Sequence, residues 1–225
     1  ELKAKRTVNV SGLVVSPGFI DLHAHGQNNI ANDFQARDGV TTALELELGV
    51  YPVGKWYASR KNKAIINYGA TVSHSISRAL ALHEVPPDHE LDLFKDALAP
   101  DISRKELDDA ALLRMTDILN QGVIDGGLGI GVGLAYVPGA RRKEIFHLYQ
   151  AAKSNSVPVF VHARVTSVVE PDSTSALQEL IANSAATGAA THVCHIGSAG
   201  GVQVPTMLKM IDGARKNGVD ISTEV

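Results

Sequence analysis

Two histidines separated by one residue stand near the start of the chain, in the segment PGFIDLHAHG at 17–26. Side chains alternate between the two faces of a strand, so Asp21, His23 and His25 share one face. Three polar side chains facing a protein interior carry a desolvation cost unless a ligand satisfies them. Two imidazoles at this spacing can bind one metal ion together, and a pair of hydrogen-bonded core histidines is the alternative. The segment predicts a metal site with His23 and His25 as ligands.

A second chemical pattern is the alternation of leucine and glutamate in TTALELELG at 41–49. If the leucines face a helical layer, Glu45 and Glu47 both point inward. Glutamate is rarely buried unless it is paired or coordinated, so a cation is expected beside this strand. Glu47 lies nearer the carboxyl end of the strand, where barrel active sites are built, and is therefore the predicted ligand. Glu45 is the fallback, and an edge strand whose glutamates contact water is the alternative.

Two further histidines follow apolar runs: His162 after VPVFV at 157–161, and His195 after THVC at 191–194. Together with the first two histidines and Glu47 they make a set of nitrogen and oxygen donors suited to one or two divalent ions, with zinc favoured. His192 and Cys194 have the opposite parity from His195 in their strand. We therefore exclude both from the site and expect Cys194 to be a small buried apolar residue.

The elements that must position these donors alternate along the chain between apolar strands and amphipathic helices, which favours a parallel sheet of βα units. Ser103 and Glu106 form a capping pair that predicts a helix ending at Gly122. The proline-rich and acidic segment 83–101 predicts a long loop that could act as a lid. The predicted strands are 18–26, 41–48, 64–72, 128–136, 157–164, 191–197 and 219–225.

Composition excludes several classes of function. Charged residues make up 20% of the 225 residues and the net charge is -3, so nucleic acid and anionic membranes are not expected partners. No stretch approaches the roughly 18 apolar residues of a membrane span. The one cysteine excludes an internal disulfide, and no signal peptide is recognised, so a cytoplasmic location is expected. Whether the chain forms a homo-oligomer is open.

The pattern PGFIDxHxH, followed by histidines on the fifth and sixth predicted strands, resembles the amidohydrolase superfamily over nearly the whole chain. Within it, GVTT at 39–42, GIGVGLAYVPG at 129–139 and HAR at 162–164 are similar to the D-aminoacylase (N-acyl-D-amino-acid deacylase) branch. The resemblance implies an α/β fold, the (β/α)8 TIM-type barrel. It implies a metal-dependent hydrolase in which metal-bound hydroxide cleaves an N-acyl-D-amino acid, with Glu47 as the bridging donor from the second strand.

Four residues are candidates for contact with the small-molecule substrate. Arg164 shares the inward parity of His162, and its planar guanidinium can bind a carboxylate in bidentate fashion. A surface arginine on the following loop is the alternative. His74, Arg78 and Tyr136 lie just past the third and fourth predicted strands and could line the pocket.

The chain also departs from the family pattern. The family's catalytic aspartate comes from an eighth strand, so we expect a barrel truncated after about seven strands at 13–225, with 1–12 either a remnant of a flanking β-domain or a lead-in segment. The catalytic acid is therefore unknown, and we expect metal binding with poor catalysis. Gly197 replaces a lysine of some deacylases. Two alternatives are a cyclic amidohydrolase of the dihydroorotase or hydantoinase type, against which the absence of a strand-four lysine counts, and a metal-binding barrel fragment without activity.

Overall fold

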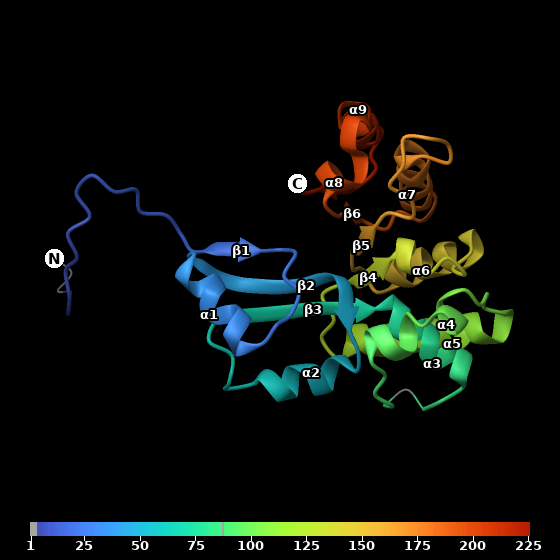
Figure 1. The fold of residues 1–225 in the computed structure, drawn as a ribbon, viewed down its shortest axis with the longest axis horizontal. Coiled ribbons are helices and arrows are strands. Elements are labelled where there is room, and N and C mark those ends of the chain that lie inside the picture. Colours follow the sequence, from blue (N-terminus) through green and yellow to red (C-terminus); the bar gives the residue numbers. More distant parts are fainter. Residues whose placement is uncertain (1–3, 87) are drawn as a thin grey trace.

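A parallel sheet forms the centre of the molecule, in a computed structural model that describes residues 4–86 and 88–225. The described residues form seven strands in the order β1 to β7, each paired in parallel with the next along the chain. The sheet curls into a half-barrel (Figure 1). The strands are β1 (Phe19–Asp21), β2 (Val40–Val50), β3 (Asn67–Ser73), β4 (Ile130–Gly133), β5 (Val159–His162), β6 (Thr191–Val193) and β7 (Ile221–Thr223).

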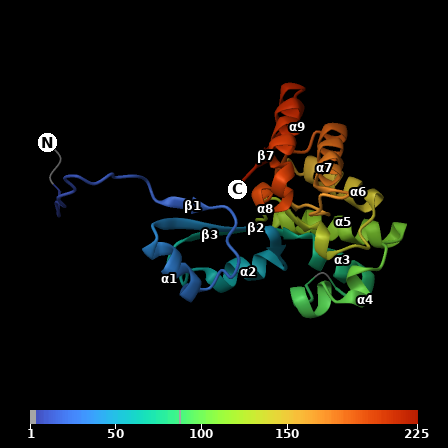
Figure 2. The ribbon, with the colours of Figure 1, turned by 45° about the horizontal axis from the view of Figure 1, so that its top comes forward.

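Helices connect successive strands, and the long ones lie along the outer side of the curl (Figures 1 and 2). This arrangement is the one that the alternating sequence pattern predicted. Among the described residues no helix has both the length and the apolar character needed to cross a bilayer. The helical elements are α1 (Asn29–Arg37), α2 (Val53–Arg60), α3 (His74–His83), η1 (Leu93–Ala97), α4 (Pro100–Ser103), α5 (Asp109–Ile124), η2 (Leu134–Tyr136), α6 (Arg142–Ser154), α7 (Ser173–Thr187), α8 (Ile196–Gly200), η3 (Gly201–Gln203) and α9 (Val204–Lys216).

The hydrophobic core fills the space between the sheet and these outer helices. Val132 and Val161 project from β4 and β5, and Met115, Leu148 and Leu177 come from α5, α6 and α7 to meet them in one buried cluster. Burying each such side chain contributes about 1.5–3 kcal/mol relative to leaving it exposed. The opposite faces of the strands are therefore free to carry polar residues toward the inside of the curl.

The seven predicted strands are all present, but several end earlier than predicted. The first, predicted over 18–26, stops at Asp21, and beyond it only an isolated bridge joins His23 to Glu45. The sixth, predicted over 191–197, stops at Val193 because the chain then turns into α8. The histidines after these two strands thus sit on rim loops rather than inside strands.

The segment before β1 is extended and leads away from the sheet (Figure 2). Residues 4–18 form no helix or strand, and the apolar side chains of Leu13, Val14 and Val15 are exposed. Residues 1–3, the beginning of the predicted lead-in segment 1–12, lie outside the described residues. The assignment of 1–12 to a flanking domain remains a prediction.

The helix predicted to begin at Ser103 begins later. The Asp108 side chain accepts a hydrogen bond from the backbone N–H of Ala111 at 2.8 Å and caps α5, whereas Ser103 is the buried last residue of α4. Side-chain capping by an aspartate one turn further along thus decides where the helix begins. The segment 83–101 is not one loop either, because η1 and the start of α4 lie within it.

A glycine at the end of β2 shapes the rim beside Glu47. Gly49 adopts a positive φ of 67°, and a Cβ there would lie 2.8 Å from the backbone nitrogen of Ser73. Only glycine accommodates both constraints without strain. The pairing of β2 with β3 shifts register between Glu45 and Val50, and the Thr71 hydroxyl donates to the Leu46 carbonyl at 2.8 Å in this region. The strand therefore bends away just after it has presented Glu47.

The cap of α7 gives a prediction about acid stability. Asp172 accepts hydrogen bonds from the backbone N–H of Ser175 (2.8 Å), the Thr174 hydroxyl (2.8 Å) and the Gln203 amide (2.6 Å). These bonds, led by the Ser175 N–H, hold the pKa of Asp172 well below its ordinary value of 3.8. A lowered folded-state pKa stabilises the fold above the ordinary value, and this stability is lost as pH falls through the folded-state pKa.

We therefore expect Asp172→Asn to lower the free energy of unfolding at pH 7, with a difference from the wild type that shrinks below the ordinary pKa of 3.8. Urea denaturation of both proteins across this pH range measures the effect. A difference that does not change with pH would contradict it.

Candidate metal centre

The carboxylate of Glu47 is the meeting point of four imidazoles. Its Oε1 lies 2.7 Å from Nδ1 of His162 and 2.7 Å from Nε2 of His195. Its Oε2 lies 3.1 Å from Nε2 of His25 and 3.3 Å from Nε2 of His23. The structure thus brings together all five residues that the sequence predicted as metal ligands.

The fold explains why residues so far apart in sequence meet. Glu47 lies near the end of β2 and His162 ends β5, while the other three histidines follow β1 and β6. All these strands run parallel, so their carboxyl ends share one rim of the curled sheet. The alternation of β2 holds as predicted: Glu47 and Glu45 are buried on the inner side, with 3% and 8% of their surfaces exposed.

The carboxylate of Glu47 is ionised, and its surroundings supply the positive charge that balances it. Burial raises the pKa of Glu47, but hydrogen bonds from the four imidazoles, led by His162, outweigh burial and hold it well below its usual range. The hydrogen bond to Glu47 raises the pKa of His23 to about 9 against the opposing effect of burial. Hydrogen bonds to Glu45 and then Glu47 raise the pKa of His25 to about 10. Protons on these imidazoles supply positive charge that a metal cation would also supply.

The donor atoms fit a divalent cation. Ligand atoms of His23, Glu47 and His195 all lie within 4.8 Å of one another. Nε2 of His195 is 2.9 Å from Nδ1 of His162, so two ring nitrogens face the same point beside the carboxylate. Nδ1 of His195 is buried and has no hydrogen-bond partner among residues 4–86 and 88–225. Imidazole nitrogens with a carboxylate oxygen are the donor set preferred by zinc.

The backbone of His195 is strained where it delivers this ligand. Its φ of 36° and ψ of 54° lie in the left-handed region, which residues with a Cβ adopt at a cost of about 1–3 kcal/mol. The N–H of the next residue, Ile196, donates to the carbonyl of Glu224 at 3.0 Å and holds the turn. Strain of this kind concentrates at functional sites.

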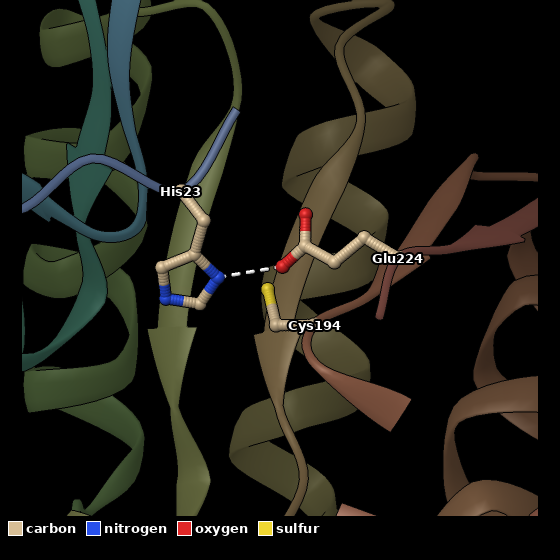
Figure 3. A group of neighbouring side chains, drawn as sticks. All are labelled: His23, Cys194 and Glu224. Carbon is tan, nitrogen blue, oxygen red and sulfur yellow. Dashed lines mark hydrogen bonds and ion pairs between the residues drawn. The ribbon is translucent and has the colours of Figure 1, made fainter. Parts of the chain in front are cut away.

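Two other carboxylates contact the histidines from the outer side of the cluster. Glu45 binds Nδ1 of His25 at 2.8 Å, and Glu224, just after β7, binds Nδ1 of His23 at 2.5 Å. Figure 3 shows the imidazole of His23 facing Glu224, with the thiol of Cys194 beside them. Sequence reasoning did not include Glu224 in the site. Its signal was its place at the carboxyl end of the seventh predicted strand, the position that the other site residues share.

The residues excluded by parity also lie near the cluster. Cys194 is buried as expected, and burial raises the pKa of its thiol. Its sulfur nevertheless lies within 4.8 Å of donor atoms of His23 and Glu224. His192 contacts Glu224 through Nε2 at 3.1 Å. Asp21, predicted to share the inner face, instead accepts a hydrogen bond from the backbone N–H of His23 at 3.0 Å and so orients the loop after β1.

A cavity of 390 Å³ opens beside the four-histidine cluster. The segment predicted as a lid contributes Leu93, Phe94 and Leu98 to its wall. Tyr136 also lies in the wall, with its hydroxyl 3.4 Å from Nδ1 of His162. The full lining is His25, Gly26, Glu45, Glu47, Leu48, Gly49, Leu93, Phe94, Leu98 and Tyr136.

Arg164 is held by another carboxylate of this chain. Its Nε and Nη2 each lie 3.0 Å from an oxygen of Glu179, and Nη1 donates to the carbonyl of Ala140 at 2.9 Å. The guanidinium is therefore engaged within the protein, and Arg164 is not among the residues that line the cavity.

His74 and Arg78 do not line the cavity either, in contrast to the sequence-based prediction. Both side chains are fully buried, and Glu144 of α6 accepts hydrogen bonds from both. Nε2 of His74 lies 2.7 Å from Glu144 Oε1, and Nε of Arg78 lies 3.0 Å from the same oxygen. These two residues thus join α3 to α6 through their hydrogen bonds with Glu144.

No protein-family model matches the chain. Two curated proteins of Alcaligenes xylosoxydans xylosoxydans are similar to it. A D-aminoacylase is 28% identical in an alignment of 171 positions that covers 61% of this chain and 31% of that protein. An N-acyl-D-glutamate deacylase is 26% identical in an alignment of 258 positions, gaps included, that covers 99% of this chain and 48% of that protein. The chain spans about half or less of the length of these relatives.

Solved structures share the fold. The N-acyl-D-glutamate deacylase of Bordetella bronchiseptica, complexed with zinc and a phosphonate inhibitor, has a TM-score of 0.72 at 23% identity and matches 93% of this chain and 47% of its own. A D-aminoacylase has a TM-score of 0.74 at 20% identity over 99% of this chain and 50% of its own. A D-hydantoinase has a TM-score of 0.57 at 16% identity over 93% of this chain and 46% of its own. The sequence relatives confirm the resemblance of this chain to the D-aminoacylase branch.

Proposed function

We propose that this chain carries the metal centre of a hydrolase that cleaves the amide bond of N-acyl-D-amino acids. The observation that carries the proposal is the buried Glu47 carboxylate, surrounded by four imidazoles at the carboxyl ends of parallel strands and open to a cavity. The similarity to proteins named D-aminoacylase and N-acyl-D-glutamate deacylase supports this reaction over other hydrolyses.

The centre would hold one or two divalent ions, with zinc favoured by the donor set. A bound divalent ion supplies hydroxide at neutral pH by lowering the pKa of water, and it polarises the acyl oxygen of the amide. The two oxygens of Glu47 face different histidine pairs, so this carboxylate can serve two neighbouring positions. The residues that would hold the ions are His23, His25, Glu47, His162 and His195.

Tyr136 is the side chain placed to contact a bound substrate. Burial, followed by the charge of Glu47, raises the pKa of its phenol, so the hydroxyl keeps its proton at neutral pH. It can therefore donate a hydrogen bond to the acyl oxygen next to His162. The leucine and phenylalanine side chains of the cavity would receive an apolar part of the substrate.

A cyclic amidohydrolase is the weaker alternative. Relatives of that kind place a bridging lysine on the fourth strand, and β4 is Ile-Gly-Val-Gly, without a lysine. The curated relatives, moreover, are deacylases of acyclic substrates by name. We therefore assign the chemistry to acyclic N-acyl-D-amino acids.

The test compares zinc-loaded protein on N-acetyl-D-leucine, N-acetyl-L-leucine, dihydroorotate and hydantoin. We expect the D-acyl substrate to be turned over fastest, because the proposal rests on the deacylase resemblance, and we expect activity to vanish with a chelator and return with zinc. Tyr136→Phe should slow turnover while leaving zinc content unchanged. Equal or faster turnover of a cyclic amide would contradict the proposal, and zinc binding without turnover would favour a metal-binding barrel without activity.

A further inference from the structure

The two histidines after β1 are each held between two carboxylates. Nε2 of His25 faces Glu47 at 3.1 Å, while its Nδ1 lies 2.8 Å and 3.0 Å from the two oxygens of Glu45. Nε2 of His23 faces Glu47 at 3.3 Å, while its Nδ1 lies 2.5 Å from Glu224. In both rings Nε2 points to the centre and Nδ1 points to an outer carboxylate.

Glu224 is itself held in place by groups from the neighbouring strand. The backbone N–H of His195 donates to its Oε1 at 3.2 Å, and Nε2 of His192 lies 3.1 Å from its Oε2. Nδ1 of His192 lies 2.8 Å from the hydroxyl of Ser222, which orients that ring in turn. Together with His23, which Figure 3 shows facing it, the carboxylate thus has three partners, which lie after β1, within β6 and just after β6.

Glu45 is similarly constrained on the other side of the cluster. It is buried on β2, two residues before Glu47, and the backbone N–H of Leu48 approaches its Oε1 at 3.4 Å. Its two oxygens both face His25. The buried Glu45 therefore lies behind His25 as Glu224 lies behind His23.

We infer that Glu45 and Glu224 are positioning residues that hold Nδ1–H of His25 and His23 and leave each Nε2 free to bind the metal. An ionised carboxylate only accepts hydrogen bonds, so the ring nitrogen that faces it must carry the proton. With a cation bound beside Glu47, the other nitrogen would offer its lone pair to that cation, and the outer carboxylate also fixes the ring's orientation and increases its basicity. This inference rests on the metal centre of the proposed function, and it separates the outer carboxylates from the ligand Glu47.

The first experiment measures zinc affinity by chelator competition in the full 225-residue chain. Losing an outer carboxylate of this kind typically costs about 10–100-fold in metal affinity, and we expect Glu224→Ala to fall in that range. Glu224→Gln keeps an oxygen that can accept from Nδ1–H, so its loss should be smaller. Glu45→Gln should resemble Glu224→Gln. The control is Glu84→Gln, an exposed carboxylate paired with Arg114, which should bind zinc like the wild type.

The second experiment reads the ring directly, by nuclear magnetic resonance of the zinc-loaded protein with 15N-labelled histidine. We expect a protected Nδ1–H signal from His23 in the wild type, exposed to exchange in Glu224→Ala and largely retained in Glu224→Gln. Circular dichroism confirms that each variant is folded, and a merely structural role for Glu224 would lower the melting temperature without moving the Nδ1–H signal.

The outcomes distinguish this inference from the proposed function. If the wild-type chain binds no zinc, the metal centre itself is wrong and both proposals fall. If the wild type binds zinc while a folded Glu224→Ala keeps full affinity and its Nδ1–H signal, only the positioning role is overturned. The positioning role is supported if zinc affinity falls slightly in Glu224→Gln and further in Glu224→Ala, and if the Nδ1–H of His23 becomes exposed to exchange in Glu224→Ala.

Discussion

Glu47→Gln is expected to lower zinc affinity by more than about 100-fold, beyond the range typical for groups that act through a ligand. Glutamine keeps the shape of the side chain but removes the charge that four imidazoles surround. Elemental analysis after purification without chelators, followed by chelator competition, measures the loss. Less than about half an ion per chain in the wild type, even after reconstitution with zinc, would contradict the site itself.

Glu45→Gln is the matched control, because Glu45 lies on the same strand, is similarly buried and directs its carboxylate to Nδ1 of His25. Its effect should be the smaller of the two. A larger loss of zinc affinity in Glu45→Gln than in Glu47→Gln would mean that Glu45, the second choice from the sequence, is the ligand. Proximity to the carboxyl end of β2 would then be a poor criterion for choosing the ligand.

Replacing Arg78 with methionine is expected to destabilise the fold by about 3–5 kcal/mol, the range for breaking a buried ion pair on one side. The change leaves the buried Glu144 with His74 as its remaining partner, while one carboxylate oxygen already lacks a partner among the described residues. It also removes the donor to the Ile102 carbonyl, 2.9 Å from Nη1. Urea denaturation followed by circular dichroism gives the change in the free energy of unfolding.

Arg141→Met provides the comparison, because Arg141 pairs with Glu106 on the surface, where such pairs contribute about 0–1 kcal/mol. The Arg78 variant should retain zinc binding at temperatures where it remains folded. A variant that keeps its stability but loses selectivity for the D substrate would instead support the pocket role predicted from sequence.

Where the alternation of side chains continued along a strand, the sequence correctly predicted which side chains are buried on its inner face. Glu45 and Glu47 lie two residues apart on β2, and both are buried as expected. His195 also reaches the cluster, but strand parity is not the reason, because β6 ends at Val193 and the left-handed backbone of His195 sets the direction of its side chain.

Other parts of the site depend on partners that local patterns do not reveal. The sequence around Arg78 does not indicate that Glu144 of α6 will enclose it, so a buried structural arginine was assigned to the pocket. Arg164 was likewise assigned by parity, whereas its partner Glu179 lies on the next helix. Glu224 was missed because its role comes from contact with His23, at the other end of the chain.

The dispersal of the ligands along the chain makes metal binding a reporter of folding. An unfolded chain keeps only His23 and His25 close together, whereas the cluster also needs β2, β5 and β6 in place. A cation held by the native cluster would therefore bind the folded state far more tightly than the unfolded one. By mass action, free metal at 100 times its dissociation constant adds about 2.7 kcal/mol to stability. The concentration of free metal would then affect the stability of this fold as well as the occupancy of its site.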